Sequence, residues 1–497
     1  MPIPEEIKKL KPQGLSHACE VRFLSGRYYV YEISSRWDEK KGRPQKTTGK
    51  CIGKIIESQG FIPNGNYVSA YSSVPSITKC YGAIEMFRQM GPDISERIRT
   101  YFPDIYRQLE TITLLRLVFK CRSSEMRYQY EHSCLMDVYP GIGLCEDSVS
   151  RVMTKLSMRR DAMVAFMKSF ARDGHQLLFD GTSFFSGMGD SFASPGYNAQ
   201  HSRDNQYRVL YIFDSTRQEP LFYRNTPGNI VDRSSFAATI EEAGVGNCIV
   251  VGDKGFYSKP NISYLMEKKI RFVLPLQSNT RQIPQEFDGN DSDSKFDGRF
   301  TFNGRNIWHK KLPVGSNGNY VYIFRDDKRR ADENALATEK REKSVGEKLI
   351  TDEDYLSDRR RGVFAYSSNI DADAKAIYLT YKARWDIEEM FDYLKNSVAL
   401  GPAYVRTNEM LEASSFINHL ALLYFYRLLS ALKKAGLSQT HTPKEIIDHG
   451  RNIYKRISYA DEREYISEMT DDDRILFEQL GVHLEIKSKN TDSKTTA

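Results

Sequence analysis

The sequence has no long hydrophobic run, and no apolar stretch approaches the about 20 residues that a membrane-spanning helix requires. The N-terminus, MPIPEEIKK, lacks the apolar core of a secretory signal peptide. These two absences argue against an integral membrane protein and against a secreted one. We therefore expect a cytoplasmic protein.

Cysteine is scarce, and none of the cysteines forms a CxxC pair. The seven residues are Cys19, Cys51, Cys80, Cys121, Cys134, Cys145 and Cys248. An odd number of scattered cysteines indicates neither a disulfide framework nor a cysteine-rich zinc site.

The chain also lacks a strong excess of either charge. Its 71 Lys and Arg against 65 Asp and Glu give a net charge of +6, which permits a polyanionic partner without demanding one. A length of 497 residues corresponds to about two to four domains.

The N-terminal part is predicted to contain strands and then helices. Residues 17–58 alternate as strands around a basic, breaker-rich turn over 36–46, which is either a contact for a DNA backbone or a solvated loop. From about 80 to 172 the spacing is helical. We predict a helix that starts at Asp147 as its N-cap and ends this segment with basic residues.

Residues 176–276 have the pattern of a mixed α/β sheet. Two short apolar strands, 176–180 and 248–253, each end in a carboxylate, Asp180 and Asp253. If the strands are parallel neighbours, both carboxylates lie at one edge of the sheet, where α/β proteins place ligands. Gly255 allows the chain to turn just after Asp253.

The stretch 381–395 (YKARWDIEEMFDYLK) contains neither Gly nor Pro, and we predict that it belongs to one helix spanning 371–398. At roughly 100° per residue, Tyr381, Arg384, Glu388 and Lys395 share one stripe beside an apolar stripe. The stripe suits an anionic site, although a solvated amphipathic helix has similar charges.

Three carboxylates, Asp180, Asp253 and Glu388, would then converge. Carboxylates without nearby His or Cys favour Mg²⁺, or Mn²⁺ in its place, and two such ions can assist a phosphoryl transfer. Each Asp alone is weak evidence, because strand ends often carry Asp as a turn residue.

Other polar residues compete for a place in this site. We expect Glu389 on a different face and Asp392 either behind Glu388 or in solvent, and we consider Asp190 as a further carboxylate near the sheet. We assign Asp214 to a strand-end turn, Asp232 to a helix N-cap and Asn229 to a loop near the site, and we do not expect His175 or His201 to bind a metal.

In combination, these motifs resemble the DDE transposases of bacterial insertion sequences, IS-four type. The resemblance rests on Asp180-Gly-Thr-Ser, on PGNIVD at 227–232, on VGDKGFY at 251–257, and on a Tyr-x2-Arg-x3-Glu-x6-Lys signature met at Tyr381, Arg384, Glu388 and Lys395. It is strong over 176–435 and less specific in the basic N-terminal part.

The resemblance implies an RNase H-like catalytic domain in which Asp180, Asp253 and Glu388 bind two Mg²⁺ ions. It implies cut-and-paste chemistry on terminal inverted repeats: water attacks a phosphodiester, and the freed 3′-OH attacks a second one. Tyr381, Arg384 and Lys395 would contact DNA phosphates. Trp308 would stack on a flipped base unless it is a core residue.

The partners implied are double-stranded DNA (transposon ends and target) and, in the synaptic complex, a second copy of the chain; the location becomes cytoplasmic and nucleoid-associated. The alternatives are a catalytically inactive, transposase-derived DNA-binding protein and a metal-dependent nuclease without strand transfer.

The expected fold class is α/β. The predicted domains are an N-terminal basic β region (1–75), a helical DNA-binding domain (76–172), an RNase H-like domain in two parts (173–276 and 361–435) around a β-rich insertion (277–360), a helical C-terminal region (436–485) and a disordered tail (486–497).

Overall fold

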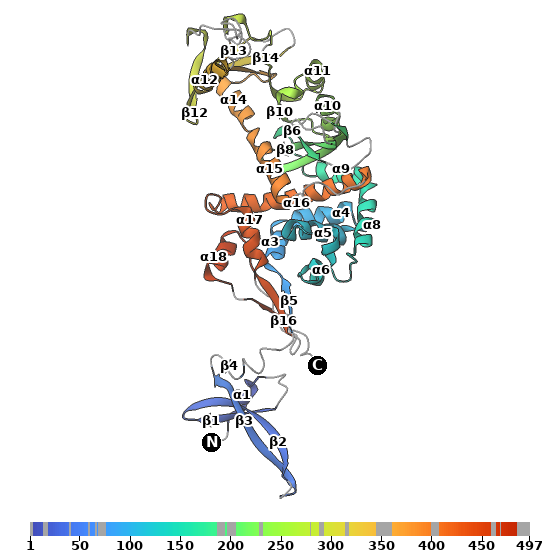
Figure 1. Ribbon diagram of the computed structural model, residues 1–497, viewed down its shortest axis with the longest axis vertical. Coiled ribbons are helices and arrows are strands. Elements are labelled where there is room, and N and C mark those ends of the chain that lie inside the picture. Colours follow the sequence, from blue (N-terminus) through green and yellow to red (C-terminus); the bar gives the residue numbers. More distant parts are fainter. Residues whose placement is uncertain are drawn as a thin grey trace, which may run out of the picture. The chain divides into compact units, whose positions relative to one another are not determined.

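A computed structural model shows a mixed α/β protein with one large sheet and many helices (Figure 1). The structure describes residues 3–12, 18–38, 41–57, 60–64, 67, 76–185, 194–195, 205–227, 232–278, 280–287, 293–313, 318–343, 360–398, 407–458, 464–467 and 469–484. Within these ranges no helix is both long and apolar enough to cross a membrane.

The chain divides into two compact units. The first consists of residues 1–86, 131–138 and 446–497, and the second of residues 87–130 and 139–445. The first unit therefore contains both ends of the chain.

The first unit contains two small sheets. A four-stranded antiparallel sheet has the order β1 (Cys19–Leu24), β2 (Arg27–Asp38), β3 (Arg43–Ile56), β4 (Gly60–Pro63). A second sheet has the order β17 (Glu464–Ile466), β16 (Tyr454–Ser458), β5 (Ser76–Cys80). The helices assigned wholly or partly to this unit are α1 (Glu5–Lys9), α3 (Gly82–Met90), α7 (Leu135–Val138), α17 (Pro443–Arg451) and α18 (Asp471–Gln479).

A small apolar core closes one side of the four-stranded sheet. It is built from Ile7, Val21, Val30, Ile52 and Ile55. These residues lie on α1 and on the inner halves of the strands, so the outer half of the β2–β3 hairpin extends beyond this core.

The second unit begins with helices. They are α4 (Pro92–Tyr101), α5 (Tyr106–Phe119), α6 (Met126–Glu131), α8 (Glu146–Ser157) and α9 (Arg160–Lys168), with a short 3-10 turn at Ser123–Glu125. The long helix α16 (Asn408–Lys434) packs against α5 and α8 on one side and against a strand of the large sheet, β9, on the other (Figure 1).

The large sheet has the order β12-β13-β14-β15-β11-β10-β6-β8, with β7 and β9 paired to β8. Its strands are β6 (Gln176–Phe185), β7 (Ser194–Pro195), β8 (Asn205–Asp214), β9 (Glu219–Pro227), β10 (Ile249–Gly252), β11 (Arg271–Pro275), β12 (Gly298–Phe302), β13 (Arg305–Leu312), β14 (Tyr320–Asp326) and β15 (Val363–Ser368). β10 runs parallel to β6 and β11, whereas the other described pairings are antiparallel.

The remaining helices of this unit are α10 (Asp232–Ala243), α11 (Lys259–Glu267), α12 (Asp327–Lys343), α14 (Ala374–Lys382) and α15 (Trp385–Tyr393), followed by a π-helical turn (Leu394–Val398). Short 3-10 turns lie at Lys254–Phe256, Gln285–Phe287 and Asp293–Lys295. β12, β13 and β14 extend the same sheet as the strands before them.

Several expected element boundaries are wrong. The predicted basic turn over 36–46 is mostly strand, because β2 continues to Asp38 and β3 starts at Arg43. Pro44 fits there because this two-stranded part of the hairpin has no further neighbouring strand that would need its N–H. The predicted N-cap at Asp147 is also wrong, since α8 begins at Glu146 after Cys145.

Within the predicted β-rich insertion, β12 and β13 form a hairpin. Asn303 and Gly304 turn the chain with positive φ angles of 47° and 71° between β12 and β13. An Asn-Gly pair favours this turn, so the sequence contained the signal.

The predicted single helix over 371–398 is interrupted. α14 ends at Lys382, and one tight turn follows, in which the N–H groups of Arg384 and Asp386 donate to carbonyls three residues back. α15 starts at Trp385 and passes into the π-helical turn. Such departures from α-helical geometry are frequent at functional sites.

Candidate active site

Asp180 and Asp253 lie side by side on neighbouring parallel strands. In the register of β6 and β10, Phe179 pairs with Gly252, so each Asp is the next residue along its strand. Asp253 follows the end of β10, as predicted, whereas Asp180 is in the middle of β6. β6 continues past Asp180 because Gly181 and the residues after it pair with β8.

The turn between α14 and α15 brings Arg384 to these carboxylates. Its Nη1 donates to Asp180 Oδ2 at 2.8 Å, and its Nη2 donates to Glu388 one helical turn further on. The guanidinium thus bridges a residue of the central sheet and a residue of α15. This contact draws Asp180 and Glu388 together, although they are far apart in the sequence.

The environment of Asp180 is the clearest electrostatic anomaly at the site. Its side chain is 19% exposed, and burial raises the pKa of its carboxyl to about 6 despite Arg384 and the N–H of Gly181, which favour the charged form. The nearby carboxylates of Asp253 and Glu388 raise this pKa further. Asp180 is therefore within electrostatic reach of both of the other acids.

Of the two further signature residues, Tyr381 lies beside these acids, whereas Lys395 contacts β6 further along the strand. The ring of Tyr381 stacks on Tyr366 with centroids 4.3 Å apart, and burial raises the pKa of its hydroxyl to about 12, so it stays protonated and able to donate. The ammonium of Lys395 lies 5.7 Å from the ring centroid of Phe184 on β6, and burial lowers its pKa.

Trp308 lies apart from the three acids, on β13. Its Nε1 donates to Asp327 at 2.9 Å, and its ring contacts Phe296 and the guanidinium of Arg325. It is partly buried against a cluster of apolar residues that includes Phe296. A stacking role on a flipped base remains a prediction.

A group of cations next to Arg384 was not predicted from the sequence. Burial lowers the pKa of Lys382, and the positive charges of Arg305, Arg329 and Arg384 lower it further, while Asp326 acts in the opposite sense. The Lys382 ammonium lies 5.2 Å from the ring centroid of Tyr378. No motif marks Lys382, because its neighbours come from β13 and α12.

The competing polar residues have other partners. Glu389 accepts from the hydroxyl of Tyr393, and Asp392 accepts from Asn396. Asp190, His201 and Asn229 lie outside the described residues, and α10 begins at Asp232, whose side chain also lies outside them.

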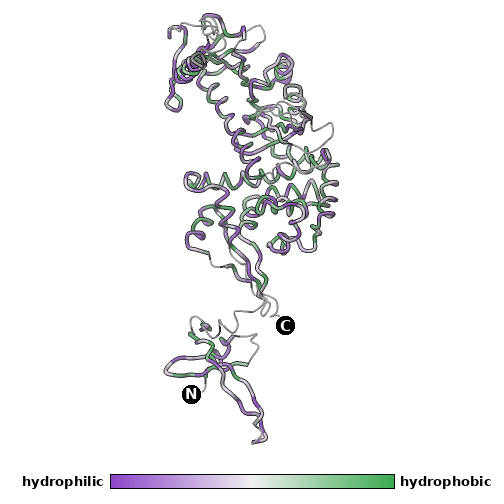
Figure 2. The backbone as a smooth tube through the Cα atoms, in the orientation of Figure 1, coloured by the Kyte–Doolittle hydropathy of each residue, from purple (hydrophilic) through white to green (hydrophobic). Residues whose placement is uncertain are grey.

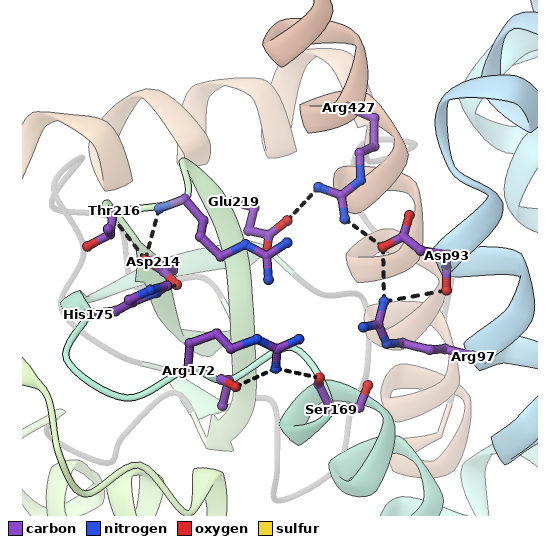
Figure 3. Close-up of polar contacts among 11 residues, drawn as sticks. Asp93, Arg97, Ser169, Arg172, His175, Asp214, Thr216, Glu219 and Arg427 are labelled. Carbon is purple, nitrogen blue, oxygen red and sulfur yellow. Dashed lines mark hydrogen bonds and ion pairs between the residues drawn. The ribbon is translucent and has the colours of Figure 1, made fainter.

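Asp214 is a strand-end turn residue, as predicted. Its Oδ1 accepts from the N–H groups of Thr216 and Arg217, and its Oδ2 contacts His175 Nδ1 at 2.6 Å (Figure 3). His175 is therefore engaged in a turn at the opposite end of β6.

A network of ion pairs and hydrogen bonds holds the helices against the sheet. Arg427 of α16 donates to Glu219 at the start of β9 and to Asp93 of α4, and Asp93 also accepts from Arg97 (Figure 3). Arg160 of α9 similarly joins Glu242 of α10 to Glu412 of α16.

The donor set of the site suits a hard divalent cation, but the observed arrangement contains a guanidinium in place of one. In the part of the chain that the structure describes, no three His, Cys, Asp or Glu residues are placed to hold an ion. Because Arg384 bridges Asp180 and Glu388, binding an ion between these carboxylates requires Arg384 to release at least one of them.

The family described as "Transposase DDE domain" matches residues 171–424. The cryo-EM structure of the piggyBac transposase synaptic complex with hairpin DNA is 12% identical, with 83% of this chain and 78% of that chain covered and a TM-score of 0.40. The Mos1 transposase paired-end complex with the left transposon end is 14% identical, with 33% and 56% covered and a TM-score of 0.15.

These two TM-scores are too low for either structure to bear on details of the fold. No curated protein matches the chain. The family match, in contrast, covers more than half of the sequence and contains Asp180, Asp253 and Glu388. The protein therefore belongs to the transposase DDE domain family and is a DDE transposase, a DNA-cleaving and DNA-transferring enzyme.

Proposed function

We propose that this protein is an IS-four-type transposase that cuts its insertion sequence out at the terminal inverted repeats and joins it to target DNA. The observation that supports this most is the placement of Asp180, Asp253 and Glu388. The two aspartates are neighbours on β6 and at the end of the parallel strand β10, and Glu388 is linked to Asp180 through Arg384. The Tyr-x2-Arg-x3-Glu-x6-Lys spacing supports the assignment to the IS-four type.

An RNase H-like core fits the strand order. β9, β8 and β6 form an antiparallel meander, and β10 and β11 continue the sheet in parallel from β6. Asp180 then lies on β6 and Asp253 at the end of β10. β6 is the strand at which the pairing changes from antiparallel, with β8, to parallel, with β10. In this proposal, residues 173–276 and 361–435 form the catalytic domain around the insertion at 277–360, and residues 1–75 and 76–172 serve DNA binding.

Asp180, Asp253 and Glu388 would hold divalent metal ions, Mg²⁺ or Mn²⁺ in its place, as carboxylates without nitrogen or sulfur ligands prefer. When bound, such ions supply charge neutralisation at the phosphate and a more acidic nucleophile. Arg384 would pass from the carboxylates to a DNA phosphate, where its planar fork can form two hydrogen bonds.

The other cations and Tyr381 would hold the DNA strand. The protonated hydroxyl of Tyr381 and the ammonium of Lys395 are donors suited to phosphate oxygens. Lys382, with Arg305 and Arg329 near it, would extend this row of cations toward β13 and α12. We further propose that two copies of the chain join two DNA ends in a synaptic complex and that the protein acts at the nucleoid.

The direct test uses the full-length protein, a labelled duplex carrying the terminal repeat of its element, and Mg²⁺. Nicked, hairpin and joined products are separated on denaturing gels. We expect Asp180→Asn, Asp253→Asn and Glu388→Gln each to reduce cleavage by about a thousandfold or more, because each removes one charged ligand with little change of shape. DNA binding, measured by fluorescence anisotropy, should persist.

Glu389→Gln and Asp392→Asn are the matched controls, because they change the same charge on the same helix near Glu388. Both should cleave like the wild type. Cleavage retained by Glu388→Gln but lost in either control would contradict the assignment of Glu388. A wild type that binds but never cleaves would point to an inactive DNA-binding protein, and one that cleaves without joining would point to a nuclease.

A further inference from the structure

The outer half of the β2–β3 hairpin is exposed on both faces. Every described residue of 34–37 and 41–50 is exposed, whereas the inner half of the same strands covers the apolar core of the four-stranded sheet. Strand pairing nevertheless continues outward to the pair Asp38 and Arg43. The result is a two-stranded ribbon without a core of its own, which we call the outer ribbon (Figure 1).

The outer ribbon is mainly basic. Among its described positions it carries Arg36, Lys41, Arg43, Lys46 and Lys50 against one acidic residue, Asp38 at the end of β2, and Figure 2 colours it in purple and pale tones. Lys46 pairs with Glu20 on β1, which anchors the base of the ribbon. Isolated two-stranded ribbons are only marginally stable in water, so a partner that covers this one would be expected.

The register divides the ribbon into two chemically different faces. Arg36 lies opposite Gln45, and residues two positions apart share a face, so Ser34, Arg36, Arg43, Gln45 and Thr47 all lie on one side. All five side chains carry groups that can donate or accept hydrogen bonds. The other face presents Trp37 opposite Pro44 and Ser35 opposite Lys46, and Trp37 is 62% exposed.

We propose that the outer ribbon enters the major groove of double-stranded DNA with the Arg36–Gln45 face toward the base edges. The major groove is wide enough for a two-stranded ribbon, and Arg and Gln are the side chains that bind guanine and adenine edges there in pairs of hydrogen bonds. Lys50 and the other ribbon lysines contact phosphates. The inference extends the proposed function: the outer ribbon selects the terminal repeat that Asp180, Asp253 and Glu388 cut.

The test measures binding of the full-length protein to a terminal-repeat duplex and to a scrambled duplex of the same length and composition, in EDTA. We expect Arg36→Ala and Arg43→Ala each to weaken binding to the repeat about tenfold or more, with a smaller loss on the scrambled duplex. Lys50→Ala should weaken binding to both duplexes about equally. It should also reduce the dependence of the binding constant on salt concentration by about one phosphate contact.

Arg27→Ala is the matched control. Arg27 is an exposed arginine at the other end of β2, so the variant removes the same charge from the same strand outside the ribbon. It should bind like the wild type. Thermal unfolding of all variants should match the wild type, because none of these side chains is buried.

Methylation protection identifies the groove. Guanine N7 faces the major groove, so bound protein should protect guanines in the repeat, and Arg36→Ala or Arg43→Ala should lose one protected guanine each. Wild-type affinity in both variants, or equal loss on repeat and scrambled duplexes without N7 protection, would overturn the proposal. Asp180→Asn separates the two proposals: it should lose cleavage and keep the guanine protection, whichever way the ribbon variants behave.

Discussion

At the scale of single residues, the site contains a cation that belongs to the chain itself. Arg384 contacts two of the three acids, and it still leaves Asp180 with a raised pKa because burial outweighs its charge. The ionised carboxylate of Asp180 is therefore energetically unfavourable in the folded protein. This charge costs stability, and its removal should be measurable.

Asp180→Asn should stabilise the metal-free protein at neutral and alkaline pH. The unfolded carboxyl ionises near its ordinary value of 3.8, but the folded one ionises near 6, so the wild type loses stability as the pH rises through this window. The variant lacks this loss and should gain about 2–3 kcal/mol above pH 7 and nothing below about pH 4. Urea unfolding in EDTA across this pH range measures the difference, and a gain that does not change with pH would contradict it.

His419 should give the opposite pH dependence. It is fully buried on α16 between the rings of Tyr211 and Tyr223, and burial lowers its pKa from 6.5 to about 3. The free energy of unfolding is therefore not reduced by His419 above pH 6.5. It falls as the pH decreases below 6.5, because the unfolded chain binds a proton at His419 and the folded chain does not.

His419→Leu keeps the volume and removes this titration. At about pH 4.5 the wild type should have lost about 2–3 kcal/mol that the variant retains. Urea unfolding at acid and neutral pH tests it. Identical pH profiles would show that His419 does not control acid stability.

At the scale of elements, the sequence predicts the strands and helices better than the contacts between them. The apolar run 248–253 predicts β10 to within one residue at each end, and the helix expected to begin at Asp232 is α10. The tight turn at Arg384 was not predicted, since nothing in an uninterrupted helical pattern marks it. The turn places Arg384 where its guanidinium donates to Asp180, a residue far away in the sequence.

The candidate acids illustrate the same limit. Asp253 could be predicted because it ends an apolar strand. Glu388 could be predicted because it shares one stripe of a helical pattern with Tyr381, Arg384 and Lys395. Asp180 was found for the wrong reason, because β6 does not end there: its pairing with β10 stops at Phe179, whereas its pairing with β8 continues to Phe185. The cations around Lys382 could not be predicted, because they come together only when α14 packs on β13 and β11.

The contacts between elements should depend on Arg160. It lies between Glu242 and Glu412, donates to the carbonyl of Tyr223 and thus joins α9, α10, α16 and β9. Arg160→Met should reduce the free energy of unfolding by about 2 kcal/mol or more, since it leaves the partly buried Glu412 without its cation and Glu242 with Arg224 alone.

Arg159→Met is the adjacent control. Arg159 pairs with the more exposed Asp104, and its loss should cost less than about 1 kcal/mol. Combining Arg160→Met with Glu412→Gln should cost less than the sum of the two single changes, because the shared interaction is lost only once. Equal effects of the two arginine variants in urea unfolding would argue against this network.

At the scale of the whole molecule, the first unit is assembled from the two ends of the chain. β16 is the middle strand of its sheet and pairs with β5 from the N-terminal part and with β17. The second unit lies between these segments in the sequence and supplies all of the candidate catalytic residues.

Ile457→Pro should disrupt this sheet, because proline removes an N–H from its middle strand and does not fit there. Hydrogen exchange of the β5 amides, residues 77–80, should accelerate, while β6 and β10 in the second unit keep their protection. Ile457→Ala, which retains the N–H, should leave β5 protected. Unchanged exchange in the proline variant would contradict the role of β16.

The pairing of β5 with β16 also has a consequence for synthesis on the ribosome. β5 leaves the ribosome early, and its partner β16 is made about three quarters of the chain later. At about 5–20 residues per second, β5 waits for roughly twenty seconds to more than a minute. A chain that terminates before β16 is made can still pair β1 to β4, which are close in sequence, but it leaves β5 without β16.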